Sequence, residues 1–151
     1  MKPDTKLLVI GYGNQLRGDD GVGPIVAEIV DGWNLNGVQS IVCPLLTPEL
    51  ADPISQARLA VFVDASVDGT GQVELSRLEP HESCQIMAHA ADPRTMLALA
   101  RDVFGHTPAA WWLKIPASEL EFGRHFSPPA QRGVSEALEK LRTLCKSLQV
   151  S

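Results

Sequence analysis

The sequence predicts an α/β fold, with one domain built on a twisted, mostly parallel sheet of about five strands and helices on both faces. Short apolar runs alternate along the chain with segments of helical periodicity. Two of these runs are continuously apolar, which is typical of strands buried on both faces of a parallel sheet. No linker, repeat or low-complexity tract divides residues 1–151, a usual length for a single domain.

Five segments are expected to form strands. The first and third are the continuously apolar runs, and they end at Gly11 and Asp64. The fourth alternates apolar and polar residues after a turn-rich segment, which predicts an edge strand. The expected strands are Lys6–Ile10, Val38–Val42, Leu59–Val63, Gln72–Leu78 and Ala110–Ile115.

Helices are expected between these strands and at the end of the chain. Thr47-Pro48 and Asp92-Pro93 are typical helix starts, Pro128-Pro129 opens a terminal helix, and Gly105 is a typical helix end. The apolar stripes expected to face the sheet are Val22, Ile25, Val26, Ile29 and Val30, then Met96, Leu97, Ala100, Val103 and Phe104, then Val134, Leu138, Leu141, Cys145 and Leu148.

Composition excludes several classes of protein. A net charge of -5 without a basic run argues against nucleic-acid binding. No apolar stretch approaches the roughly 20 residues that span a membrane, and the first apolar run is too short for a signal peptide. Three widely spaced cysteines, Cys43, Cys84 and Cys145, fit reduced thiols. We therefore expect a cytoplasmic protein.

The segment Gly11–Gly23 carries most of the chemical information, because it concentrates five glycines, an asparagine and two adjacent carboxylates between a buried strand and a helix. Its glycines permit positive φ and close approach of a ligand, and Asn14 can hold a tight turn. A dinucleotide-binding loop is disfavoured because Leu16 replaces the third glycine and Cys43-Pro44 replaces the ribose-binding acid. The Gly-Lys-Ser/Thr of a Walker loop is absent as well.

Two adjacent carboxylates in this segment, Asp19 and Asp20, need an explanation. One of them could cap the following helix. The other is not explained in this way, because neighbouring carboxylates repel at neutral pH. We therefore expect one of the pair to face a cation or a reacting group.

Asp64 and His89 are further candidates. Ligand sites of such folds lie beyond the carboxyl ends of the strands, which singles out residues 12–23, residues 64–71 and the approach to Asp92. Asp64 follows five apolar residues, and a functional role and a capping role through Ser66 both remain open. A lone histidine such as His89 is more often an ordinary loop residue. A zinc site of Cys84 with His81 or His89 lacks the paired spacing of such sites, and His106 and His125 carry no second signal.

Taken together, Gly11–Leu16 and Gly18–Gly23 closely resemble the G-x-G-N-x-L-x-x-D-[DE]-x-x-G signature of the [NiFe] hydrogenase maturation proteases. Further similarities follow in order along the chain, at Thr47–Leu50, Val61–Ala65, His89 and the loop Ile115–Pro128. The resemblance implies an endopeptidase that removes the C-terminal extension of a hydrogenase large-subunit precursor after nickel insertion. It also implies an α/β fold.

The resemblance assigns three metal ligands, which are also the catalytic residues, to Asp20, Asp64 and His89. Gly13, Asn14, Asp19 and Gly21 would support the loop. The nickel would be supplied by the precursor, and zinc or cadmium would substitute for it in vitro; no organic cofactor is implied. Two carboxylates and one imidazole suit such borderline metals and leave coordination positions open. We expect a monomeric, aspartic-type endopeptidase.

Three other functions remain to be compared with this one. A non-proteolytic, nickel-recognising accessory protein would carry the same three ligands. A peptidyl-tRNA hydrolase shares the Gly-x-Gly-Asn turn, but its T-R-H-N-x-G element is absent and the acidic charge disfavours tRNA. A dinucleotide-binding module is disfavoured for the reasons given above.

The last expected strand and the loop after it carry large apolar groups. Alternation places Trp111 and Trp112 on opposite faces of the sheet, each covered by a helix and part of the core. The loop Pro116–Ser127 is expected to contribute to the choice of substrate.

Overall fold

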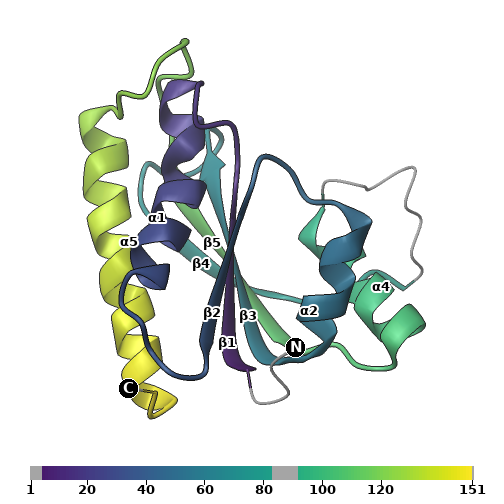
Figure 1. The fold of residues 1–151 in the computed structure, drawn as a ribbon. Helices are drawn as coiled ribbons and strands as arrows, with labels where there is room; N and C mark the ends of the chain where they lie inside the picture. Colours follow the sequence, from purple (N-terminus) through teal and green to yellow (C-terminus); the bar gives the residue numbers. More distant parts are fainter. Residues whose placement is uncertain (1–4, 83–91, 151) are drawn as a thin grey trace.

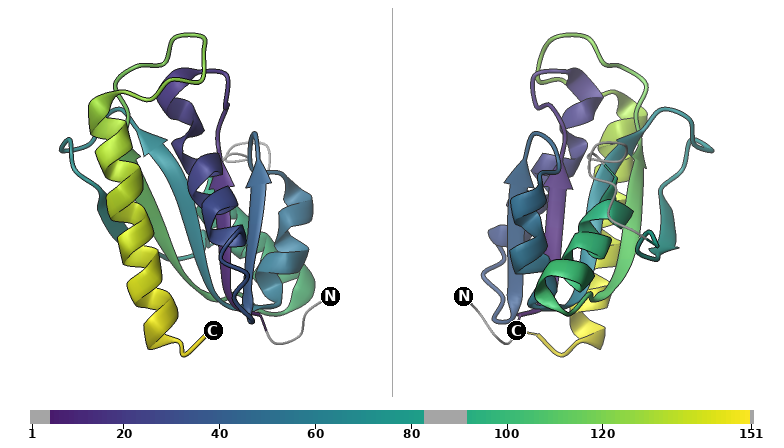
Figure 2. Two further views of the ribbon diagram at one scale, coloured as in Figure 1. Left: turned by 60° about the vertical axis from the view of Figure 1, so that its left-hand side comes forward. Right: turned by 90° about the vertical axis from the view of Figure 1, so that its right-hand side faces the viewer.

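The computed structural model describes residues 5–82 and 92–150 and has three layers, with helices on both faces of a five-stranded sheet (Figure 1). Helices α1 and α5 cover one face, and α2 and α4 cover the other (Figure 2). This arrangement confirms the predicted fold class. The strands are β1 (Thr5–Tyr12), β2 (Val38–Cys43), β3 (Ala57–Ser66), β4 (Glu74–Leu78) and β5 (Ala109–Pro116), and the helices are α1 (Val22–Asp31), α2 (Ala51–Ser55), α4 (Pro93–Phe104) and α5 (Pro128–Ser147), with 3-10 turns η1 (Gly18–Gly21) and η2 (Pro48–Leu50).

The sheet has the strand order β2-β1-β3-β5-β4. The first four of these strands are parallel, and β4 pairs antiparallel with β5 at the edge, as its alternating sequence predicts. Strand β3 is longer than its apolar core, because its pairing with β5 continues to Ser66 opposite Pro116. Asp64 therefore lies within the strand and caps no turn, so the capping interpretation of this residue is wrong.

Two apolar clusters, one on each face, hold the layers together. Residues of β1 alternate between them: Leu8 and Ile10 pack beneath α2 and α4, while Leu7 and Val9 pack beneath α1 and α5. All four side chains are fully buried. Burial of β1 on both faces explains its continuously apolar sequence.

Some residues of the expected helix stripes lie outside the core. Ile29 of α1 is 37% exposed, because this helix contacts the sheet through its small residues Gly23 and Ala27. A Cβ at Gly23 would lie 2.4 Å from the backbone oxygen of Val63, so the helix rests directly on the strand. Phe104 of α4 is also exposed and lines a surface hollow, and Val103 is exposed beside it. The last turn of α4 therefore contributes nothing to the core.

Trp111 and Trp112 lie on opposite faces, as alternation predicts, and each packs against one of the two apolar clusters. Both are only half-buried. Of the three cysteines, Cys43 and Cys145 are free thiols, and Cys84 lies outside the described residues. In the described part of the chain, no helix has the length and apolar character needed to cross a membrane.

Candidate functional site

The loops that follow β1, β3 and β5 gather at one end of the sheet, because these strands are parallel and their carboxyl ends share an edge (Figure 1). Two of the three segments predicted to form the site, residues 12–23 and 64–71, lie there. The third, the approach to Asp92, falls largely within residues 83–91, outside the described residues, and His89 is among them. The loop after β5 was expected only to influence substrate choice, but it takes part in building this end of the molecule.

The glycine-rich loop folds back on itself around Asp20. Gly13 has φ +146°, and a Cβ on it would lie 2.1 Å from the backbone oxygen of Asp20. The amide of Asn14 donates to Oδ2 of Asp20 at 2.7 Å, and Asn14 Oδ1 accepts from the amide of Leu16 at 2.9 Å. Gly13 allows the close approach of the backbone at Asp20, and the side chain of Asn14 holds a turn at Leu16.

Gly21 ends this loop and is the N-cap residue of α1. A Cβ on it would lie 3.2 Å from Cα of Gln15, which leaves little room for a side chain. Neither η1 nor α1 has a side-chain capping hydrogen bond at its start. The prediction that an aspartate of the pair caps the helix through its side chain is therefore wrong.

Asp19 instead holds the loop that follows β5. Its side chain is fully buried and accepts four hydrogen bonds from that loop. The donors are the amides of Ser118 at 2.8 Å, Glu119 at 3.0 Å and Ser127 at 2.7 Å, and the Ser127 hydroxyl at 2.6 Å. Burial alone would raise the pKa of Asp19, but the hydrogen bonds from Ser127, Ser118 and Glu119 outweigh burial and lower it.

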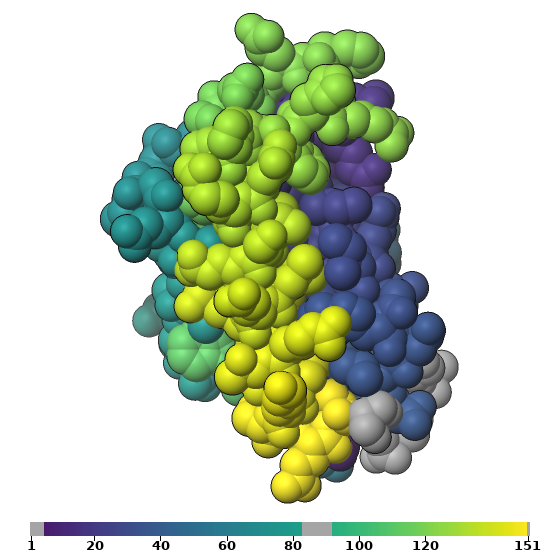
Figure 3. Space-filling view, turned by 90° about the vertical axis from the view of Figure 1, so that its left-hand side faces the viewer, coloured from purple at the N-terminus to yellow at the C-terminus, as the bar shows by residue number. Residues whose placement is uncertain are grey.

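Backbone hydrogen bonds join the same two loops. The amide of Gly18 donates to the oxygen of Gly123 at 2.9 Å, and the amide of Gly123 donates to the oxygen of Leu16 at 2.8 Å. The amide of Asp19 also donates to the oxygen of Glu119 at 2.8 Å. In Figure 3 the two loops form one continuous surface, green and purple, at the end of the molecule. The 117–127 loop is thus an integral part of the candidate site.

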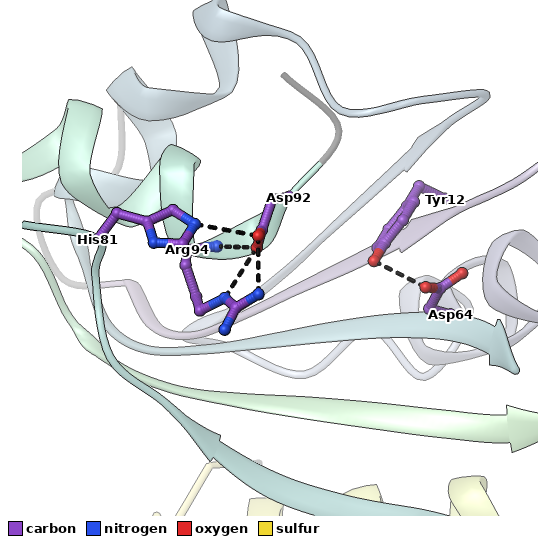
Figure 4. A network of polar contacts seen from close by, with 5 residues as sticks. All are labelled: Tyr12, Asp64, His81, Asp92 and Arg94. Atoms are coloured by element: carbon purple, nitrogen blue, oxygen red, sulfur yellow. Dashed lines mark hydrogen bonds and ion pairs between the residues drawn. The ribbon is translucent and has the colours of Figure 1, made fainter. Parts of the chain in front are cut away.

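Asp64 lies near the end of β3 and is half-buried. Its Oδ2 accepts a hydrogen bond from the Tyr12 hydroxyl at 3.0 Å, and its second oxygen points away from the tyrosine (Figure 4). Burial raises the pKa of Asp64; the Tyr12 hydrogen bond opposes this, and the negative charge of Asp20 adds to it. The turn η1, which holds Asp20, contacts strand β3, which holds Asp64.

Tyr12 is the residue of this site that sequence analysis missed. It is the last residue of β1 and is 8% exposed. Burial holds the pKa of its hydroxyl far above the usual range, and the charge of Asp64 raises it further, so the hydroxyl is a hydrogen-bond donor at neutral pH. The only available signal was its position between Gly11 and Gly13 at the end of a buried strand.

A second group of polar residues lies on the same face, at the start of α4. Asp92 caps this helix by accepting from the amide of Arg94 at 2.9 Å, which confirms the predicted helix start. Its carboxylate also accepts from the Arg94 guanidinium and lies 3.0 Å from Nε2 of His81 (Figure 4). Burial opposes ionisation of Asp92, but the Arg94 contacts outweigh it and lower the pKa. His81 therefore has a structural partner.

The charge of Asp92 also contributes to the raised pKa of Tyr12. The start of α4 consequently lies near the Tyr12 and Asp64 pair, and the chain reaches that start through residues 83–91. Figure 4 shows two separate sets of contacts, Tyr12 with Asp64 and Asp92 with His81 and Arg94.

Two carboxylates held close together fit a divalent cation, since a positive charge between them would relieve their repulsion. Within residues 5–82 and 92–150, no group of three histidine, cysteine, aspartate or glutamate side chains could hold a metal ion. Of the three predicted ligands, Asp20 and Asp64 lie within the described residues and His89 does not.

No protein-family model matches the chain, and no curated protein sequence matches it. Solved structures do. The hydrogenase maturating endopeptidase HybD from Escherichia coli aligns with 97% of this chain and 95% of its own, with a TM-score of 0.72 and 19% identity. The [NiFe] hydrogenase maturation protease HycI from Thermococcus kodakarensis KOD1 aligns with 94% of this chain and 93% of its own, with a TM-score of 0.74 and 20% identity. The chain shares the complete fold of these proteins.

Substitution of Asp19 by asparagine should destabilise the fold by about 1–3 kcal/mol at pH 7, because an amide cannot accept from four donors as a carboxylate does. The pKa of Asp19 is depressed in the folded protein, so its stabilising contribution is complete above the ordinary value of 3.8 and is lost as the pH falls further. Urea unfolding of both proteins at pH 7 and near pH 3 measures this. The difference should shrink at the lower pH; a difference independent of pH would refute the assignment.

Substitution of Asp64 by asparagine should have the opposite effect on the metal-free protein. An aspartate with a raised pKa costs stability once it is ionised, so the cost is present at neutral pH and disappears as the pH falls through the raised pKa. We expect the variant to melt about 2–4 °C above the wild type at pH 7, the shift that about 1 kcal/mol produces in a chain of this size. Thermal unfolding in the presence of a chelator measures it, and a lower melting temperature would contradict the prediction.

Proposed function

We propose that this protein is an endopeptidase that removes the C-terminal extension of a [NiFe] hydrogenase large-subunit precursor after nickel insertion. The observation that carries the proposal is the contact between the turn η1, which holds Asp20, and strand β3, whose carboxyl end holds Asp64. These residues come from the two segments that resemble the acidic motifs of the maturation proteases. The fold shared with HybD and HycI supports the same conclusion.

Asp20, Asp64 and His89 form the proposed metal-binding and catalytic set. The two carboxylates would bind nickel that the precursor already holds, and His89 would complete the set from the segment before α4. Zinc or cadmium would substitute for nickel in vitro. A metal bound by oxygen and nitrogen ligands with open positions supplies Lewis-acid polarisation of the scissile carbonyl or of water.

The described residues have separate parts in this scheme. The backbone of the glycine-rich loop holds Asp20 through the amide of Asn14. Asp64, with one oxygen occupied by Tyr12, keeps a second oxygen that can bind the cation. Asp19 has no free acceptor role of this kind, because four donors surround its carboxylate. We therefore assign catalysis to Asp20 rather than to Asp19.

The proposed partner is the large-subunit precursor itself, which meets a monomeric enzyme in the cytoplasm. The 117–127 loop would form part of the docking surface, since it is joined to the loop that carries Asp20. Phe122 at its tip is 87% exposed and would offer an apolar side chain to the precursor.

The function is tested by incubating the protein with nickel-loaded and nickel-free precursor and measuring the mass of the C-terminus. We expect cleavage of the nickel-loaded precursor only. Asp20→Asn, Asp64→Asn and His89→Ala should each lower the cleavage rate at least about 100-fold, as expected for groups that act in the transition state. Asp31→Asn, an exposed carboxylate at the C-terminal end of α1, is the matched control and should retain full activity.

Binding of the nickel-loaded precursor without any cleavage would refute the endopeptidase and indicate the non-proteolytic accessory protein. Full activity of Asp20→Asn with loss of activity in a folded Asp19→Asn protein would reverse the assignment of the two aspartates.

Docking through the 117–127 loop makes a separate prediction. Phe122→Ser should lower kcat/KM for the precursor about tenfold, which corresponds to about 1.4 kcal/mol of lost binding, and should leave the unfolding free energy unchanged. Phe104→Ser, at the exposed end of α4, is the matched control. Exchange of Ser118–Gly123 for the loop of a related protease should alter which precursor is cut. Unchanged kcat/KM and preference would exclude the loop from docking.

A further inference from the structure

A row of side chains crosses the sheet at the level of Asp64. Tyr12 pairs with Cys43 of β2, and Asp64 pairs with Lys114 of β5. Gly11 of β1 lies opposite Val63 of β3 in the parallel register. The residues that follow them, Tyr12 and Asp64, are therefore neighbours on adjacent strands. The tyrosine therefore meets the carboxylate from the neighbouring strand, and the backbone register of the sheet fixes this contact.

The ring of Tyr12 is fixed independently of its hydroxyl. It is 8% exposed and belongs to the apolar cluster beneath α2 and α4. A phenylalanine would fill the same space, so packing alone does not require the hydroxyl. The hydroxyl has a polar partner in Oδ2 of Asp64, to which it donates a hydrogen bond at 3.0 Å.

The carboxylate of Asp64 has two hydrogen-bonding neighbours that stabilise its charged form, the Tyr12 hydroxyl and the backbone amide of Ala65, and of these Tyr12 is the side chain. Asp64 is half-buried, and its two carboxylate oxygens could exchange places by rotation about the last side-chain bond. Bonding of Oδ2 to a rigid phenol removes this freedom, and the other oxygen points away from Tyr12 (Figure 4). Partners that orient a metal-binding carboxylate in this way commonly contribute to metal affinity.

We propose that Tyr12 is a positioning residue for Asp64: its hydroxyl holds one carboxylate oxygen and leaves the other directed out of the strand pair to bind the cation. The inference rests on the proposed function in that Asp64 is taken as a ligand. Tyr12 itself makes no contact with metal or substrate in this scheme. Packing in the core fixes its ring, and the fixed ring in turn holds the hydroxyl in place beside the carboxylate.

The substitution that tests this role is Tyr12→Phe, which removes the hydroxyl and keeps the ring. In calorimetric titration with Zn²⁺ alone, we expect the variant to bind about tenfold more weakly than the wild type, the lower end of the effect of removing such a partner. Thr95→Val is the matched control, because Thr95 has a buried hydroxyl that makes no hydrogen bond within the described residues. It should bind Zn²⁺ as the wild type does.

Crystal structures of the metal-free wild type and Tyr12→Phe give a second readout that needs no activity. The carboxylate of Asp64 should have one orientation in the wild type and a changed or divided orientation in the variant. Equal Zn²⁺ affinity in the two proteins, an unchanged carboxylate, or a wild type that binds no Zn²⁺ would overturn the proposal.

The outcomes also separate this role from the proposed function. If Tyr12→Phe weakens Zn²⁺ binding but the wild type cleaves no precursor, Tyr12 positions Asp64 and the proposed function fails. If the wild type cleaves precursor and Tyr12→Phe binds Zn²⁺ normally, only the positioning role fails.

Discussion

The buried carboxylate of Asp19 joins two loops that the sequence separates by about a hundred residues. A buried charge is costly unless hydrogen bonds replace its hydration, and here three amides and one hydroxyl do so. Separation of the two loops would break all four of these hydrogen bonds. The carboxylate of Asp19 therefore holds the loops together. Asp20 is the next residue, so its place beside Asp64 depends on the same contact.

Asp20 and Asp64 show a different relation between charge and stability. Their carboxylates repel, and burial adds to the cost of ionising Asp64. A fold selected for stability alone would gain by neutralising one of them, whereas a site that binds a cation needs both charges. Ionised Asp19 stabilises the fold through its hydrogen bonds, whereas ionised Asp64 lowers the stability of the metal-free fold. The adjacent aspartates of the glycine-rich loop thus have separate physical roles.

The fold was predictable from sequence because its signals are local. Continuous apolar runs identify the buried strands, alternation identifies the edge strand β4, and Asp92-Pro93 with Gly105 marks the two ends of α4. The errors arise where tertiary packing decides. Ile29 has the right spacing for the core, but α1 approaches the sheet through Gly23, which turns Ile29 outward.

The candidate site was predictable only in part. The parallel sheet places the segments that carry Asp20 and Asp64 at one edge, as the strand ends require, and His89 stays a prediction outside the described residues. The role of Asp19 could not be read from its neighbours, because its partners, Ser118, Glu119 and Ser127, lie far along the chain. Tyr12 was missed because its hydroxyl bonds to Asp64, a residue of β3 that lies 52 positions away in the sequence. The structures of HybD and HycI show the same fold at about 20% identity, so they leave these side-chain roles to experiment.

The central claim, that this edge of the sheet binds a metal ion, is tested most directly by a crystal structure of the protein soaked in Cd²⁺ or Zn²⁺, with anomalous data to locate the ion. The account predicts one principal site, bound by carboxylate oxygens of Asp20 and Asp64 and by the imidazole of His89, with Asp19 still bonded to the 117–127 loop. An ion bound elsewhere, with Asp20 and Asp64 free of it, would contradict the account.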